Sequence, residues 1–220
     1  MLKQLPNILT LGRLVLTVIF LAMLLFAPEP ADPDRSLYLD LAFVLFVITG
    51  LTDIVDGKLA RKFNVTSKFG RILDPLADKV LVCGTFLCFA IIVQPKLFNF
   101  SGATLAAIHW TTFAILVARE LYVTILRQVA EARGVNFAAT RSGKLKMFLQ
   151  SFAIGTVIIK MAHVPTATWG SWFTAITYIL MLMATIFSGL RATLRPAWKT
   201  LSTTATPQNT HSANCDLSER

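Results

Sequence analysis

Long apolar runs separated by short polar connections dominate the hydropathy pattern of this chain. Six such runs lie at about residues 8–27, 37–57, 75–95, 103–125, 146–163 and 170–190. Each is close to the roughly 20 residues that an α-helix needs to cross a bilayer. No segment has the pattern of a sheet, and the connections are too short to hold a soluble domain. The pattern predicts an all-α integral membrane protein with six transmembrane helices.

The end of the chain differs in character from the six apolar runs. Residues 200–220 are rich in Ser, Thr, Asn and Gln and contain one Pro. Such a composition buries too little apolar surface to fold and is typical of disorder. We therefore expect one membrane domain over residues 1–199 and a disordered polar tail over 200–220 that the chemistry does not need.

Charge indicates how the predicted helices are oriented. The formal net charge is +9, and Lys and Arg gather at the N-terminus, in the second and fourth connections and after the last run. The positive-inside rule then places both termini on the cytoplasmic side of a cytoplasmic (inner) membrane. The net charge suits anionic headgroups and phosphorylated substrates. Nucleic acid is not an expected partner, because the positive charge is confined to loops that flank the membrane.

Candidate chemistry is concentrated in residues 53–78, which read Asp-x2-Asp-Gly-x2-Ala-Arg-x8-Gly-x3-Asp-x3-Asp. Ionisable groups at membrane depth are costly and usually serve function. On a helix, Asp53 and Asp56 fall within one arc of about 140° that also holds Gly57, Ala60 and Arg61. Asp74 and Asp78 are one turn apart on the next helix. Four carboxylates on two facing helices predict a site for hard divalent cations that faces the cytoplasm.

Other roles for the same residues stay open. Asp74 precedes Pro75 and has the sequence of a helix N-cap followed by Pro at the first helical position. Small residues such as Gly57 serve close helix packing in many membrane proteins. Carboxylates inside apolar segments also mark ion pathways, so a divalent-cation transporter is an alternative class of function.

The spacing of the motif resembles that of the CDP-alcohol phosphotransferases, which are integral membrane enzymes. Eight positions match: Asp53, Asp56, Gly57, Ala60, Arg61, Gly70, Asp74 and Asp78. The resemblance implies a pair of Mg2+ or Mn2+ ions with Asp53, Asp56 and Asp74 as the main ligands. It makes Asp78 the candidate general base, which would also contribute to the metal site.

The same resemblance implies where the nucleotide binds. Small residues at Gly57, Ala60 and Gly70 would let the cytidine diphosphate approach the backbone, and Arg61 would donate to phosphate. The stretch from Pro6 to Arg13 resembles the branch of the family that makes phosphatidylglycerophosphate. In that branch Asn7 and Thr10 would line the nucleotide-lipid site, whereas Arg13 would either take part or only extend to the interface.

Two further stretches resemble this branch and imply an acceptor site. They are Arg119-Glu120-Leu121 with Leu126-Arg127, and Ser142-Gly143-Lys144-Leu145-Lys146. The side chains that would hold the phosphate of a small phosphorylated alcohol are Arg119, Arg127, Lys144 and Lys146. Met147 departs from the branch, which often has Thr there.

The resemblance thus implies transfer of a phosphatidyl group from CDP-diacylglycerol to sn-glycerol 3-phosphate by a homodimeric enzyme. The same chemistry with another acceptor stays open: phosphatidylglycerol would make a cardiolipin synthase, and inositol phosphate an inositol-lipid synthase. A dianionic acceptor is favoured, because a neutral alcohol would not need several positive donors.

Overall fold

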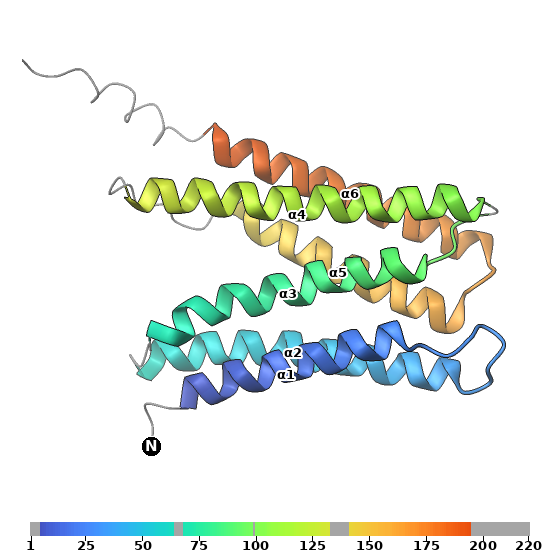
Figure 1. The fold of residues 1–220 in the computed structure, drawn as a ribbon, viewed down its shortest axis with the longest axis horizontal. Helices are drawn as coiled ribbons and strands as arrows, with labels where there is room; N and C mark the ends of the chain where they lie inside the picture. The colour runs from blue at the N-terminus through green and yellow to red at the C-terminus, as the bar shows by residue number, and fades with distance from the viewer. Residues whose placement is uncertain (1–4, 64–67, 99, 133–140, 195–220) are drawn as a thin grey trace, which may run out of the picture.

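The computed structural model describes residues 5–63, 68–98, 100–132 and 141–194. Within these ranges every regular element is a helix, and the elements are α1 (Leu5–Leu25), α2 (Arg35–Phe63), α3 (Lys68–Ile92), α4 (Gly102–Ala132), α5 (Arg141–His163) and α6 (Thr168–Thr193) (Figure 1). Some helical residues are described by their backbone alone; they are 5–10, 53–63, 68–76, 78, 131, 141–142 and 144. The expectation of an all-helical protein with six helices is confirmed.

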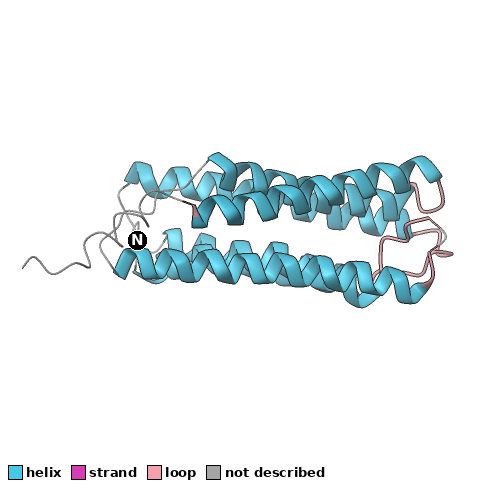
Figure 2. Ribbon diagram, turned by 90° about the horizontal axis from the view of Figure 1, so that it is seen from above, coloured by secondary structure: helices cyan, strands magenta, loops and turns pink. Residues whose placement is uncertain are grey.

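The six helices run alternately up and down and form an elongated bundle of two layers (Figures 1 and 2). Contacts between the described residues close the bundle into a ring with the order α1, α2, α5, α6, α4 and α3. An additional contact between α3 and α5 crosses the ring. Because the helices alternate in direction, the end of α2 and the start of α3 lie at the same end of the bundle as the start of α1 (Figure 1). We call this end of the bundle the motif end.

Helix α6 shows how the bundle divides its inner and outer surfaces. Its buried residues recur every three or four positions and are mostly small or hydroxylated, including Gly170, Thr174, Thr185, Ser188 and Gly189. Its large aliphatic side chains face outward, and Ile179, for example, is 60% exposed. Small residues inside and large apolar residues outside are typical of helices packed in lipid, where close approach of backbones replaces hydrophobic burial.

Aromatic side chains fill the interior between helices. Phe20 of α1 lies against Phe46 of α2 with ring centroids 5.4 Å apart. Phe86 of α3 meets Tyr178 of α6 edge to face at 5.9 Å. Such contacts add about 0.5–1.5 kcal/mol to the area they bury. They fix α1 against α2 and α3 against α6 in the interior of the bundle.

Three helical segments in the described part of the chain are long and apolar enough to cross a membrane. They are Arg35–Thr52, Leu145–His163 and Thr168–Thr193. Shorter apolar helical segments cover Leu11–Leu25 and Lys79–Ile92. These apolar helices indicate a membrane protein.

The prediction that Asp74 caps a helix is wrong. Helix α3 begins at Lys68, so Asp74 and Pro75 lie inside it rather than at its start. The apolar run marks only the part of the helix suited to lipid, whereas the helix itself extends into the charged segment. A proline in this position removes one backbone hydrogen bond and strains the turn before it, and the helix accommodates this. Capping therefore offers no explanation for the Asp74 carboxylate.

Candidate active site

The structure brings the two halves of the aspartate motif to one end of the bundle. Asp53 and Asp56 lie in the last three turns of α2, and Asp74 and Asp78 lie in the first three turns of α3. Only residues 64–67 separate the two helices, and Figure 1 shows the end of α2 beside the start of α3. The backbone thus brings the two halves of the motif to adjoining helix ends, and the facing of the carboxylates stays a prediction because the four side chains lie outside the described part of the chain.

The donor set of these segments fits a hard divalent cation. Carboxylate oxygens are the ligands that Mg2+ and related ions prefer in proteins. Among the side chains that the structure describes, no group of three or more His, Cys, Asp or Glu could hold a metal ion. The predicted metal ligands are the four aspartates of the motif, whose side chains lie outside that description.

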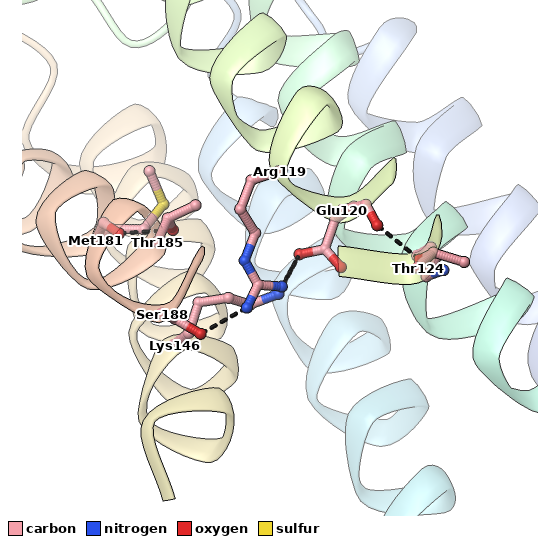
Figure 3. A network of polar contacts seen from close by, with 8 residues as sticks. Arg119, Glu120, Thr124, Lys146, Met181, Thr185 and Ser188 are labelled. Carbon is pink, nitrogen blue, oxygen red and sulfur yellow. Dashed lines mark hydrogen bonds and ion pairs between the residues drawn. The ribbon is translucent and has the colours of Figure 1, made fainter. Parts of the chain in front are cut away.

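A polar network joins three helices in the interior of the bundle (Figure 3). Arg119 of α4 donates through Nη1 to Glu120 Oε1 at 3.1 Å and through Nη2 to Ser188 Oγ of α6 at 2.5 Å. Lys146 of α5 forms an ion pair with the same oxygen of Glu120. One carboxylate therefore lies between two cations.

The network is shielded from its surroundings. The side chains of Arg119, Glu120 and Lys146 are only 12%, 16% and 7% exposed. Charges in such a place interact strongly, and each needs a partner or a ligand. We call Arg119, Glu120, Lys146 and Ser188 the central charge network.

The central charge network is connected to the helix that carries half of the aspartate motif. Thr124, one turn after Glu120 on α4, donates through its hydroxyl to the Glu120 carbonyl at 2.6 Å. Lys79 follows Asp78 on α3 and donates through Nζ to Thr124 Oγ1, also at 2.6 Å. A continuous polar path therefore leads from the residue next to Asp78 to the central charge network.

The predicted acceptor residues fall into two groups. Arg119 and Lys146 come together through Glu120, although they are on different helices. Arg127 is exposed and lies about two turns further along α4 toward the motif end. Lys144 is in the first turn of α5, and its side chain lies outside the description.

The predicted nucleotide residues belong mostly to the segments described by their backbone alone. Asn7 and Thr10 lie in the first two turns of α1, at the motif end. The side chains of these two residues and of the remaining motif positions, Gly57, Ala60, Arg61 and Gly70, lie outside the described part. Arg13 is described: it is only 3% exposed. The Arg13 side chain is thus enclosed by the bundle. This contradicts the interpretation that Arg13 only extends to the membrane interface.

Sequence reasoning missed Glu120 as a counter-ion, as well as Ser188, Thr124 and Lys79. The signal available for Glu120 was a carboxylate beside an arginine within an apolar run. No local signal identifies Ser188, which lies 69 positions from Arg119 in the chain. Two histidines lie in the described part of the chain: His109 Nε2 is 3.2 Å from the Pro95 carbonyl, and His163 pairs with Asp40 at 2.9 Å.

Comparison with known proteins identifies the family of the chain. Residues 3–199 match the family described as CDP-alcohol phosphatidyltransferase. The chain is 36% identical over 162 residues to the CDP-diacylglycerol–glycerol-3-phosphate 3-phosphatidyltransferase of Bacillus subtilis, covering 71% of this chain and 77% of the relative. It is 30% identical over 194 residues to the enzyme of the same name from Escherichia coli, covering 87% of this chain and 97% of the relative. A probable phosphatidylglycerophosphate synthase of Mycobacterium tuberculosis is 33% identical over 159 residues, which cover 72% of this chain and 68% of the relative. With its motif at the adjoining ends of α2 and α3, the chain belongs to the CDP-alcohol phosphatidyltransferase family.

Proposed function

We propose that this protein transfers the phosphatidyl group of CDP-diacylglycerol to sn-glycerol 3-phosphate, giving phosphatidylglycerophosphate and CMP. The observation that carries the proposal is the complete eight-position motif, found where α2 and α3 adjoin, in a chain that matches the family over residues 3–199. The acceptor follows from similarity to relatives whose names state this reaction. Buried cations near the motif support a phosphorylated acceptor.

The proposal includes a topology. All six helices would cross the cytoplasmic membrane, with both termini and the motif end on the cytoplasmic side. The helices are 21 to 31 residues long, which suffices for a span. The basic connections support the orientation, because loops rich in Lys and Arg stay cytoplasmic. By family resemblance we expect the enzyme to act as a homodimer.

Members of this family generally use divalent metal ions. In this chain Asp53, Asp56 and Asp74 would hold two ions, Mg2+ or Mn2+, and Asp78 would contribute to the same site. Bound metal supplies positive charge that neutralises a diphosphate and its leaving group. Without such charge, four neighbouring carboxylates would repel one another and some would protonate.

The motif residues around the aspartates would bind the nucleotide. Gly57, Ala60 and Gly70 offer little side-chain bulk, so cytidine and diphosphate can approach the helix backbones. Asn7 and Thr10 of α1 would line the same site at the motif end. Arg61 offers a permanently charged fork of N–H donors that fits phosphate oxygens.

The transfer itself needs a base and a stabilised leaving group. Asp78 accepts the proton of the C1 hydroxyl of glycerol 3-phosphate, and the freed oxygen attacks the phosphorus that carries diacylglycerol. The bond from this phosphorus to the CMP oxygen breaks, and Arg61 donates to the phosphate of the departing CMP. The acyl chains stay in the bilayer throughout, and no covalent enzyme intermediate is formed.

The central charge network supports the choice of a dianionic acceptor. Arg119 and Lys146 lie together at the carboxylate of Glu120, so a phosphate that reaches this place would meet two cations whose N–H donors fit its oxygens. Arg127 and Lys144 would supply further charge on the side nearer the motif. A neutral alcohol would gain little from such a group, because the energy comes from charge-assisted hydrogen bonds.

CMP release by the purified protein with CDP-diacylglycerol, Mg2+ and a panel of acceptors tests the proposal. We expect release with glycerol 3-phosphate to exceed release with phosphatidylglycerol, inositol phosphate or serine at least about tenfold, the effect of one charge-assisted hydrogen bond. Release with a different alcohol alone would retain the motif chemistry and overturn the acceptor. Absence of release with every acceptor, from folded and metal-loaded protein, would instead favour the transporter.

Replacing Arg127 by Ala tests the acceptor site separately from the nucleotide site. We expect the KM for glycerol 3-phosphate to rise about tenfold, because a hydrogen bond to a charged group contributes roughly 1.5–3 kcal/mol. The KM for CDP-diacylglycerol should change less than about twofold, within the range of an exposed substitution. Steady-state kinetics in mixed micelles measure both constants.

Arg191 provides the matched control for this substitution. It is exposed in the last turn of α6, where its guanidinium lies 5.1 Å from the Phe187 ring, and has no place in the proposed site. Arg191→Ala should leave both constants near those of the parent. Equal increases of the two constants in Arg127→Ala would show that the acceptor site is misplaced.

A further inference from the structure

A groove in the surface of the bundle lies away from the aspartate motif. It has a volume of about 360 Å3 and runs over α5 between α2 and α6. Its walls are mainly apolar and include the aromatic rings of Phe43 from α2, Phe152 from α5 and Phe173 from α6. Phe152 and Phe173 are 46% and 48% exposed, so the groove is open to the surroundings of the bundle. This size is within the roughly 300–1,000 Å3 typical of ligand sites.

A buried lysine lies at one end of this groove. Lys160, in the last turn of α5, lines the groove and is only 3% exposed. Its Nζ donates to the carbonyls of Val164 at 3.4 Å and Pro165 at 3.3 Å. In the described part of the chain Lys160 has no ion pair. The carboxylate of Asp40, which lies at this end of the bundle, pairs with His163. An ammonium has three N–H donors, so Lys160 has one donor and its full charge available.

The two threonine hydroxyls that line the groove are already satisfied by their own helices. Thr156 donates to the Phe152 carbonyl at 2.9 Å, and Thr174 donates to the Gly170 carbonyl at 2.8 Å. Their hydroxyl protons therefore need no hydrogen-bond acceptor from a ligand. The groove thus offers a long apolar surface with one cationic end.

The position of Lys160 in the bundle indicates how deep in the membrane the cationic end of the groove lies. Lys160 and Trp169 flank the turn from α5 to α6, at the opposite end from the motif (Figure 1). Trp169 and Trp172 are 67% and 59% exposed, and exposed tryptophans of membrane proteins gather at the level of the lipid headgroups. The ammonium therefore lies at headgroup level, and the groove extends from it toward the middle of the membrane.

We propose that this groove binds one anionic phospholipid, with its phosphate on Lys160 and an acyl chain along Phe43, Phe152 and Phe173. The charge selects a lipid with net negative charge, and the aromatic walls accept the chain. This lipid is distinct from the substrate, whose diphosphate would lie at the motif end. The site goes beyond the proposed function: it does not depend on the reaction, but it rests on the membrane-spanning arrangement proposed above.

Fluorescence of Trp169 reports directly on an occupant of the groove, because Trp169 is part of its lining. A variant with Trp110, Trp172 and Trp198 replaced by Phe keeps Trp169 as its one tryptophan. It is reconstituted in phosphatidylcholine vesicles that contain a small fraction of dibrominated phosphatidylglycerol or dibrominated phosphatidylcholine as a quencher. We expect phosphatidylglycerol to quench at about fivefold lower mole fraction, because one lysine contributes about that factor toward an anionic lipid.

Two substitutions in this background separate charge from shape. Lys160→Met keeps the length of the side chain and should abolish the preference for phosphatidylglycerol. Lys96→Met, at an exposed lysine near the same end, should retain it. Gly155→Leu leaves Lys160 in place and fills the groove, since even a Cβ at Gly155 would lie 3.2 Å from Phe43 Cε2. It should weaken quenching by phosphatidylglycerol about fivefold, and it keeps the test decisive if Lys160→Met does not fold.

Three outcomes would overturn the proposal. The first is equal quenching by the two lipids, and the second is a preference that survives in Lys160→Met or in Gly155→Leu. The third is protection of Trp169 from both lipids, which would show that protein, such as a second copy of the chain, covers the groove.

Discussion

Replacing Asp56 by Asn is expected to lower the rate of CMP release about a thousandfold or more. The amide keeps the size of the side chain but removes the negative charge with which the motif would hold a divalent cation. Charge stabilisation by a bound metal contributes several kcal/mol to such a reaction, and each 1.36 kcal/mol is a factor of ten in rate. Chelation of divalent ions should have a similar effect on the parent protein. Both are measured by CMP release from purified protein in micelles.

Two further measurements show whether this loss comes from the metal site. Asp56→Asn should weaken Mn2+ binding in a calorimetric titration, while its gel-filtration profile stays that of the parent. Asp34→Asn is the control, because Asp34 is an exposed carboxylate at the opposite end of the bundle, and it should keep normal activity. Ordinary activity in Asp56→Asn would remove the two-metal scheme.

Glu120→Gln is expected to destabilise the folded protein by about 3 kcal/mol. The substitution removes the carboxylate that pairs with Arg119, whose side chain is only 12% exposed. Removing one partner of a buried ion pair costs roughly 3–5 kcal/mol, because an uncompensated charge remains. Unfolding in mixed micelles with increasing SDS, followed by tryptophan fluorescence, measures the change.

A second substitution tests whether charge is the cause of the lost stability in Glu120→Gln. Glu120→Gln combined with Lys146→Gln restores the charge balance and should recover at least about 1 kcal/mol, a typical coupling energy for residues in contact. Asp40→Asn breaks the exposed pair with His163 and should cost less than about 1 kcal/mol. Additive losses in the double variant would contradict a shared electrostatic network. Unchanged stability in Glu120→Gln would show that the network does not hold the helices together.

The helices themselves were predictable, whereas their ends were not. The six apolar runs correspond to the six helices, because each helix satisfies its backbone hydrogen bonds within itself and needs only a suitable local sequence. The predicted start near residue 75 missed the first turns of α3, which begins at Lys68. Hydropathy marks the part of a helix suited to lipid, but polar residues such as Arg71 and Asp74 continue the same hydrogen-bonding pattern.

The motif was equally readable from local spacing. Asp53 and Asp56 are three residues apart, and Asp74 and Asp78 are four apart, so helical periodicity alone puts each pair on one face. The short connection over residues 64–67 then keeps the two pairs at the same end of the bundle. The predicted acceptor residues were harder to identify from the sequence. They are scattered over α4 and α5, and whether they come together depends on how these helices face each other.

By itself, the sequence determined the helical class and the family, and it predicted the segment that would carry the chemistry, since all three depend on residues close together in the chain. Only the tertiary structure decided the ring order of the helices, the pairing of Glu120 with Lys146 and the groove beside Lys160. In lipid, a helix can be apolar on its inner and outer faces alike, so hydropathy does not reveal which side meets a neighbour. Contacts between residues such as Arg119 and Ser188 exist only once packing has fixed those faces.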